Sequence, residues 1–175
     1  MIIAISGKTA SGKDTVAKLL SKKTGFKLLS FSFKDFLKEK YSKEVLEFER
    51  RLDLNFDKEF DSWVKKEVLK YKDQNLIVVS RLSAINLQDI ADLKIFLYAS
   101  DDERAKRLAK RENLSLKEAK KLLEERDKVF EERIKKVYGI KYDDPIYYDI
   151  IINTTDKDPN EVVDIIASLV SNKKI

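Results

Sequence analysis

Short apolar runs alternate along the chain with longer segments in which apolar residues recur every three or four positions. The apolar runs at 1–6, 27–30, 76–79, 93–98 and 148–152 predict five short strands. The longer segments predict helices at 13–23, 101–111, 116–137 and 159–170, and mostly helical structure from about 34 to 71. Strands that alternate with helices favour parallel pairing. We therefore expect an α/β fold of three layers, with a five-stranded parallel sheet flanked by helices.

Length and composition narrow the chemistry. A chain of 175 residues suits one domain that builds its own core. It contains no cysteine and no histidine, which excludes a disulfide framework, a thiolate zinc site and the commonest general base. Catalysis must then rest on carboxylates, lysine, arginine, hydroxyls and a hard cation. No apolar run approaches the roughly 18 residues of a membrane span, so we expect a cytoplasmic protein with no membrane partner.

Charge patterning argues against a nucleic-acid partner. Charged residues make up 38% of the chain, yet the formal net charge is only +5. Most lysines are interleaved with acids along the predicted helices, which is typical of a solvated surface. We expect a monomer that binds small molecules.

The strongest motif follows the first predicted strand. It reads GKTASGK from Gly7 to Lys13 and leads into a predicted helix, which is the context of a Walker A phosphate loop. Backbone N–H groups of such a loop and the helix N-terminus surround phosphate oxygens, and the lysine reaches the β- and γ-phosphates. The dinucleotide spacing G-x-G-x-x-G is missing. The predicted ATP contacts are Gly7, Lys8, Thr9, Ala10, Ser11, Gly12, Lys13, Asp14 and Thr15.

The residue after the loop lysine departs from the motif. Serine or threonine usually stands there and its hydroxyl binds Mg²⁺, whereas this chain has Asp14 followed by Thr15. A carboxylate can hold Mg²⁺ directly or through water, so Asp14 and Thr15 are the predicted metal ligands. Alternatively, Asp14 is an acid that complements the helix dipole.

Arginines recur on one side of two consecutive predicted helices. Arg104, Arg107 and Arg111 are spaced i, i+3, i+7, and Arg126 and Arg133 are spaced i, i+7. Two such rows would form a lid that closes over phosphates, since planar guanidinium groups bind phosphate at two points. The alternative is a pair of surface helices joined by Glu–Arg pairs, which neighbouring glutamates make credible: Glu103, Glu112, Glu124 and Glu125.

Polar residues at other strand ends predict the acceptor side. Arg81 closely follows the buried strand 76–79, and ligands of open parallel sheets bind at the carboxyl ends of strands. Ser30 ends the second predicted strand and Ser32 follows it. Asp57 and Asp61 are four residues apart on one helical face and could contact a base or a sugar, or simply face solvent.

These motifs resemble the cytidylate kinase family, particularly its short archaeal members, over nearly the whole chain. The resemblance is strongest at 91–97 (ADLKIFL), 103–107 (ERAKR), 125–127 (ERD), 137–140 (VYGI) and 148–154 (YDIIINT). It implies an ATP-side and lid role for Arg104, Arg107 and Arg111. It also implies lid and acceptor roles for Arg126, Asp127 and Arg133, phosphate contact by Arg81, and a monophosphate-binding role for Asp57 and Asp61.

The departures from the family lie on the acceptor side. Val79 and Ser80 stand where the family has an acid and a glycine before Arg81, and no arginine follows Ser30 until Arg50. The segments 11–15 and 31–34 also resemble phage-type deoxynucleoside monophosphate kinases.

The resemblance and the motifs together predict transfer of the ATP γ-phosphate to CMP or dCMP, with Mg²⁺. The acceptor region would span about 31–73 and the lid about 104–137. The residues assigned to catalysis are Lys13, Arg81, Arg126 and Arg133. Alternatives are a P-loop kinase for another deoxynucleotide or for a hydroxyl acceptor, with Asp35 or Asp57 as base, and a nucleotide-binding regulatory module.

Overall fold

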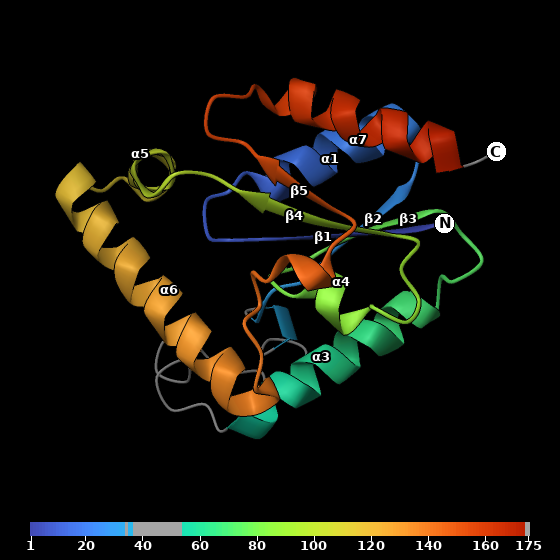
Figure 1. The fold of residues 1–175 in the computed structure, drawn as a ribbon, viewed down its shortest axis with the longest axis horizontal. Coiled ribbons are helices and arrows are strands. Elements are labelled where there is room, and N and C mark those ends of the chain that lie inside the picture. The colour runs from blue at the N-terminus through green and yellow to red at the C-terminus, as the bar shows by residue number, and fades with distance from the viewer. Residues whose placement is uncertain (34, 37–53, 174–175) are drawn as a thin grey trace.

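A single parallel sheet organises the molecule. The computed structural model describes residues 1–33, 35–36 and 54–173. Its strands are β1 (Ile2–Gly7), β2 (Lys27–Ser30), β3 (Leu76–Val79), β4 (Leu93–Tyr98) and β5 (Ile150–Asn153). All neighbouring strands pair in parallel in the order β2-β3-β1-β4-β5 (Figure 1). The predicted five-stranded parallel sheet is confirmed, although β5 starts two residues late because a 3₁₀ turn, η1 (Pro145–Tyr147), precedes it.

The helices follow the predicted order. They are α1 (Lys13–Thr24), α3 (Leu54–Leu69), α4 (Ser83–Asn86), α5 (Asp101–Glu112), α6 (Leu116–Tyr138) and α7 (Pro159–Lys173). In the segment predicted as mostly helical from 34 to 71, α3 accounts for 54–69, while 34 and 37–53 lie outside the described residues. The sequence did not predict α4, because four residues are too few to show a helical period.

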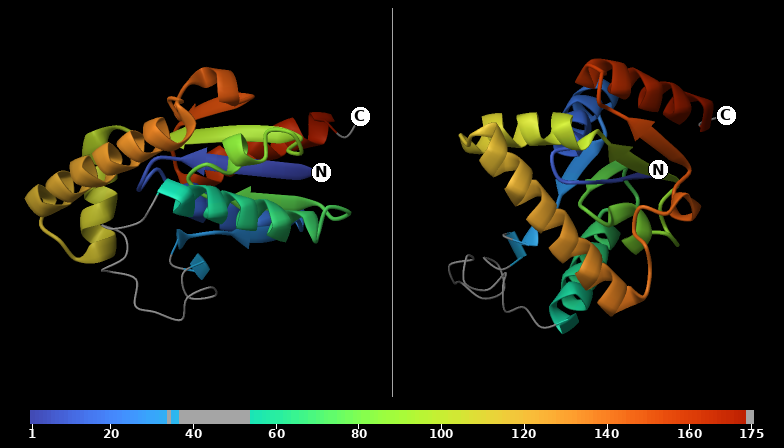
Figure 2. Two further views of the ribbon diagram at one scale, coloured as in Figure 1. Left: turned by 90° about the horizontal axis from the view of Figure 1, so that it is seen from below. Right: turned by 60° about the vertical axis from the view of Figure 1, so that its left-hand side comes forward.

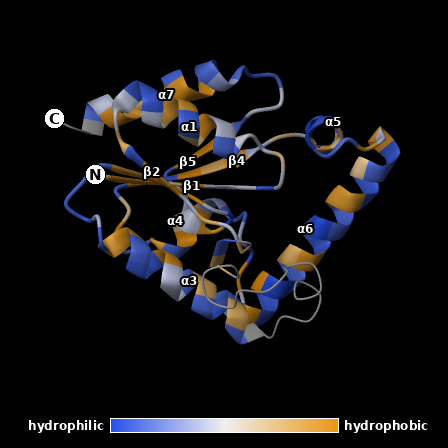
Figure 3. Cartoon of the chain, turned by 180° about the vertical axis from the view of Figure 1, so that it is seen from behind, coloured by the Kyte–Doolittle hydropathy of each residue, from blue (hydrophilic) through white to orange (hydrophobic). Residues whose placement is uncertain are grey.

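The central strand divides the core into two layers. In β1, Ile3 and Ile5 pack with α1 and α7, whereas Ile2 and Ala4 pack with α3 and α4. Successive side chains of a strand point to opposite faces, so one apolar strand contributes to both cores. Figure 3 shows apolar residues of the helices facing the sheet on both sides.

Helices α5 and α6 form a hairpin that projects beyond the carboxyl end of β4 (Figure 2). Ala105 and Leu108 of α5 pack on Ala119 and Leu123 of α6. A capping box at Ser115, reciprocated by the Glu118 side chain, starts α6. The far end of α6 reaches α3 (Figure 1). In the described part of the chain, no helix is both long and apolar enough to cross a bilayer.

Candidate functional site

The loop after β1 has a backbone that few residues can adopt. A Cβ on Gly7 would lie 2.5 Å from the Leu97 carbonyl oxygen and 2.7 Å from the Ser11 hydroxyl, so only glycine fits there. Gly12 has φ 89°, and Ala10 has φ 59° in the left-handed region. The Ser11 N–H donates to the Lys8 carbonyl at 3.1 Å. The loop therefore curls tightly before α1 begins at Lys13.

Two arginines of α5 hold this loop from outside. Arg104 is only 2% exposed and donates to the Thr9 carbonyl at 3.3 Å. The same guanidinium pairs with Asp101 at 2.6 Å and with Asp127 at 2.7 Å. Arg107 donates to the Ala10 carbonyl at 3.5 Å and, one turn further along α5, is fixed by the region that follows β5. Both side chains thus support the loop backbone.

Thr154, which follows β5, completes that support. Its carbonyl accepts from Arg107 at 2.7 Å, and its buried hydroxyl donates to the Ser11 carbonyl at 2.8 Å. The loop is thereby connected to both α5 and the end of β5. Thr154 ends the YDIIINT stretch that resembles the family, but its spacing in the sequence does not reveal this contact with the loop.

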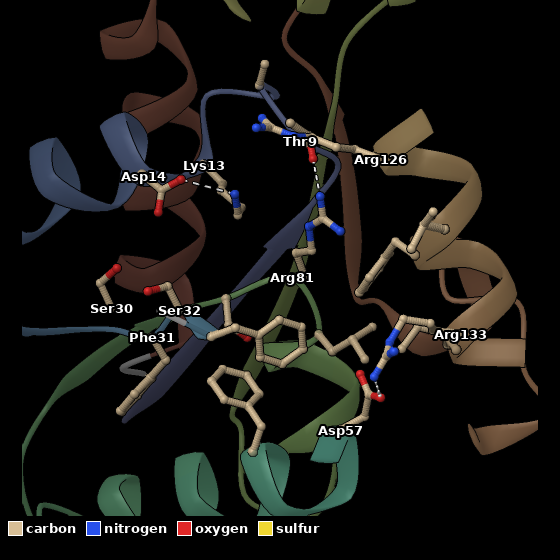
Figure 4. A pocket seen from close by; sticks show the side chains of 18 of the residues that line it. Thr9, Lys13, Asp14, Ser30, Phe31, Ser32, Asp57, Arg81, Arg126 and Arg133 are labelled. Carbon is tan, nitrogen blue, oxygen red and sulfur yellow. Dashed lines mark hydrogen bonds and ion pairs between the residues drawn. The ribbon is translucent and has the colours of Figure 1, made fainter. Parts of the chain in front are cut away.

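A cavity of about 950 Å³ opens beside the loop, between the carboxyl ends of β2 and β3 and helices α3 and α6. It brings together many of the predicted residues (Figure 4): Thr9, Ala10, Lys13, Asp14, Ser30, Ser32, Asp57, Asp61, Arg81, Arg111, Arg126 and Arg133. The other predicted residues lie outside its lining: Gly7, Lys8, Ser11, Gly12, Thr15, Arg104, Arg107 and Asp127.

Lys13 and Asp14 lie at the loop end of this cavity. The Lys13 ammonium is 3.1 Å from the Asp14 carboxylate. Burial lowers the pKa of Lys13, and the nearby Asp14 opposes that shift. The Asp14 side chain is 55% exposed, whereas Thr15 is exposed outside the cavity. Oxygen ligands suit Mg²⁺, so the carboxylate of Asp14 fits that ion.

Arg81 lies between the loop and α6. It donates to the Thr9 hydroxyl, and its guanidinium carbon lies 4.4 Å from the centre of the Phe130 ring. Its position after β3 brings this charge to the carboxyl edge of the sheet, as predicted from the sequence. A guanidinium group held between an aromatic ring and the loop, on the lining of the cavity, can bind an anion there.

At the opposite end, acids of α3 meet α6. Arg133 forms an ion pair with Asp57, which is 2% exposed, and the Tyr138 hydroxyl donates to Asp61. Burial raises the pKa of Asp61 to about 6, although the hydrogen bond from Tyr138 acts in the opposite direction. Tyr138 was not assigned a role from the sequence, because no local spacing links it to Asp61.

The wall between the two ends is aromatic. Phe31, Phe33, Phe60 and Phe130 line the cavity, and Phe31 meets Trp63 edge to face at a centroid distance of 5.2 Å. Flat apolar surfaces beside polar groups suit a planar base.

The arginines of the predicted lid are paired with glutamate. Arg126 donates through both terminal nitrogens to Glu112, at 2.9 and 3.3 Å, and Arg111 donates to the same carboxylate at 2.9 Å. Arg107 likewise pairs with Glu103 at 3.0 Å. One of these Glu–Arg pairs, Arg126 with Glu112, joins α5 to α6, and yet Arg111 and Arg126 also line the cavity.

The family model described as the cytidylate kinase-like family matches residues 2–156 of this chain. The chain belongs to the cytidylate kinase-like family. The cytidylate kinase of Sulfurisphaera tokodaii is 37% identical over 170 residues, which cover 95% of this chain and 93% of the relative. That of Thermococcus kodakarensis is 34% identical over 176 residues, covering 98% and 89%. The resemblance inferred from the motifs is confirmed.

Solved structures agree with the fold of this cytidylate kinase-like chain. An uncharacterized protein from Eubacterium ventriosum superposes with a TM-score of 0.71 at 25% identity, covering 98% of both chains. Shikimate kinase from Bacteroides thetaiotaomicron superposes with a TM-score of 0.66 at 16% identity, again covering 98% of each. At that identity the second likeness supports the shared fold alone.

One loop residue of this family member turns away from the cavity. The Lys8 ammonium lies 3.5 Å from Asp143 and 3.8 Å from Glu131. Its side chain lines a smaller hollow together with Tyr98 and Asp143. Lys8 can therefore offer the cavity its backbone but not its charge.

Proposed function

We propose that this chain is a nucleoside monophosphate kinase that transfers the γ-phosphoryl group of ATP to CMP or dCMP. The observation that carries the proposal is one cavity with a phosphate loop and Lys13 at one end and the Arg133–Asp57 ion pair at the other. Archaeal relatives over nearly the whole length are cytidylate kinases by name. The expected setting is the cytoplasm, and the expected assembly is a monomer.

ATP would bind at the loop end. The backbone from Gly7 to Thr15 and the N-terminus of α1 would enclose its phosphates, with Lys13 at the β- and γ-phosphates. Arg104 and Arg107 would act by fixing the loop from outside, and Asp127 by fixing Arg104. Mg²⁺, when bound, would neutralise charge between the phosphates, held by Asp14 directly or through water.

The acceptor phosphate would bind between Arg81 and Arg133. One of its oxygens is already anionic, so it attacks the γ-phosphorus without a general base. The bond from that phosphorus to the β–γ bridging oxygen breaks, and ADP leaves with the electron pair. Phosphoryl transfer depends mainly on positioning and charge neutralisation. Lys13 and Arg126 would supply the neutralising charge at the moving group.

The base and sugar of the acceptor would lie against the aromatic wall. Ser30, Ser32, Asp57 and Asp61 would supply the polar contacts there. Ser32 already donates to Asp35 at 2.5 Å, and Asp57 is paired with Arg133. These existing bonds engage the two carboxylates that would have to act as a base for a hydroxyl acceptor.

An acceptor panel tests the proposal. Purified protein would be given Mg-ATP with each ribo- and deoxyribonucleoside monophosphate and with hydroxyl acceptors such as nucleosides and shikimate, and ADP formation would be measured. CMP and dCMP are expected to give the highest kcat/KM. A higher value for a hydroxyl acceptor or a purine nucleotide would refute the proposal. Nucleotide binding by calorimetry without turnover would instead support a regulatory module.

A further inference from the structure

Glu112 ends α5 at the turn that leads into α6. The next residue, Asn113, closes the helix with φ 54°, in the left-handed region. The Glu112 carboxylate accepts hydrogen bonds from both terminal nitrogens of Arg126, at 2.9 and 3.3 Å. It also accepts one from Arg111 at 2.9 Å. One carboxylate therefore joins two arginines that come from different helices.

The geometry leaves one edge of Arg126 available. Arg111 and Arg126 line the cavity together with Thr9 and Lys13, whereas Glu112 does not. Figure 4 shows the Arg126 side chain extending from α6 toward the end of the cavity at which Thr9 lies. A guanidinium group has five N–H donors. The forked bond to Glu112 engages both terminal nitrogens and restrains the plane of the group. Among the residues that the structure describes, Arg126 donates to no other acceptor, so its remaining N–H donors stay available.

The position of Glu112 is unfavourable for the helix itself. The C-terminus of a helix carries partial negative charge, so a carboxylate there is disfavoured and cations are favoured. Lys110 and Arg111 in the same turn follow that preference, and Glu112 opposes it. The hydrogen bonds from Arg126, the larger influence, and from Arg111 lower the pKa of Glu112 and keep it ionised.

We propose that Glu112 is a positioning residue, which holds Arg126, with Arg111 beside it, so that the free edge of its guanidinium meets the phosphoryl group in transit. The inference rests on the proposed kinase function. A flexible arginine that is held at one edge loses fewer conformations when it meets the transition state. Glu112 therefore raises the rate without touching a substrate.

The packing of α5 against α6 does not depend on Glu112. Asp102 and Lys120 join the same helices by an ion pair at 2.7 Å, on exposed side chains, and an apolar contact lies between α5 and α6. Exposed ion pairs contribute little to stability. The loss of Glu112 should consequently change turnover and leave thermal stability unchanged.

The first test compares Glu112→Gln with a matched variant, Asp102→Asn. Glu112→Gln keeps the size of the side chain but removes the negative charge that accepts the arginine hydrogen bonds. We expect kcat to fall by about ten- to a hundredfold. KM for ATP, KM for the nucleoside monophosphate and the Tm should stay nearly unchanged. Asp102→Asn removes an ion pair between the same helices and should keep the wild-type kcat. An unchanged or higher kcat for Glu112→Gln would overturn the inference, as would an equal loss in Asp102→Asn.

A double-mutant cycle shows whether Glu112 acts through Arg126. Arg126→Gln should lower kcat more than Glu112→Gln does, and adding Glu112→Gln to it should cost no further rate. Full additivity of the two losses would overturn the inference.

The cycle is measured with the acceptor that gives the highest turnover in the panel. A preferred acceptor other than CMP or dCMP would thus refute the proposed substrate and still decide the role of Glu112. Absence of turnover with every acceptor would refute both.

Discussion

The two ends of the cavity are built in different ways. At the loop end, main-chain geometry at Gly7 and Gly12 and a buried Arg104 fix the shape. At the opposite end, called the acceptor end because the proposed function places the acceptor there, side chains from α3 and α6 are paired with each other, Arg133 with Asp57 and Tyr138 with Asp61. If the proposed function holds, the loop end is preorganised for a polyanion. At the acceptor end, an incoming phosphate would have to share Arg133 with the Asp57 carboxylate.

This difference separates substrate binding from the support of the site. Arg104 and Arg107 serve backbone carbonyls outside the cavity, so they act on the shape of the loop. Arg81, Arg126 and Arg133 line the cavity, so they are placed to act on ligands. Substitutions of Arg104 or Arg107 should therefore lower stability, whereas substitutions of the arginines that line the cavity should change kcat or KM.

The largest effect is expected from Lys13→Ala. Loss of the ammonium group at the β- and γ-phosphates should lower kcat/KM by about 10³-fold or more, because no other loop side chain can reach the same place. ADP formation measures the loss, and circular dichroism checks the fold. Lys18→Ala, at an exposed position of the same helix, serves as the control. Turnover near the wild-type rate in Lys13→Ala would show that the Lys13 ammonium group does not take part in catalysis.

Arg104→Met should lower the stability of the protein more than it weakens ligand binding. It removes the buried partner of Asp127 and of the Thr9 carbonyl, and breaking such a buried pair costs about 3–5 kcal/mol of unfolding free energy. Urea unfolding measures the change, with Lys106→Met, at an exposed position of the same helix, as control. If the two variants unfolded at the same urea concentration, the loop end would not depend on this buried support.

Arg133→Ala should affect the acceptor and spare ATP. We expect KM for the nucleoside monophosphate to rise about 10- to 100-fold, the scale of a lost charged hydrogen bond, while KM for ATP changes little. The variant also leaves Asp57 unpaired and buried, so Arg133→Ala/Asp57→Asn is needed to remove that second charge. Equal rises in both KM values would contradict a division of the cavity into two ends.

The smallest effect concerns Asp61 and pH. Burial raises its pKa from an ordinary value near 3.8 to about 6. As pH falls from about 6 to 4, the folded state takes up a proton while the unfolded chain stays ionised. The free energy of unfolding of the wild type should then rise by about 1–3 kcal/mol relative to Asp61→Asn. Urea unfolding of both proteins at pH 7 and pH 4.5 measures this difference. If the difference in unfolding free energy between wild type and Asp61→Asn were the same at both pH values, Asp61 would not be desolvated in the folded protein.

The loop end could be predicted because its signal is local. A strand, two glycines, a lysine and a helix are adjacent in sequence, and the resulting geometry agrees. The arginine rows were also visible, since i, i+3, i+7 spacing puts side chains on one side of a helix. Spacing could not show which of them is buried. Arg104 is buried because Asp127, 23 residues later, reaches it across the α5–α6 packing.

The acceptor end depends on contacts that sequence spacing does not encode. Asp57 and Arg133 are 76 residues apart, and Asp61 and Tyr138 are 77 apart. Each pair forms only because the end of α6 that is remote from α5 packs against α3. The pairing of Arg126 with Glu112 was foreseen only in general terms, as Glu–Arg pairing between surface helices.

The single tryptophan of the chain lies behind the acceptor end, where Trp63 meets the ring of Phe31, which lines the cavity. Indole emission shifts with the polarity and packing around the ring. The protein consequently contains its own fluorophore at one of the two ends. A titration with nucleoside monophosphate alone should alter the emission spectrum. An ATP analogue bound only at the loop should leave that spectrum nearly constant. Binding at the two ends of the cavity can then be told apart by fluorescence without any label.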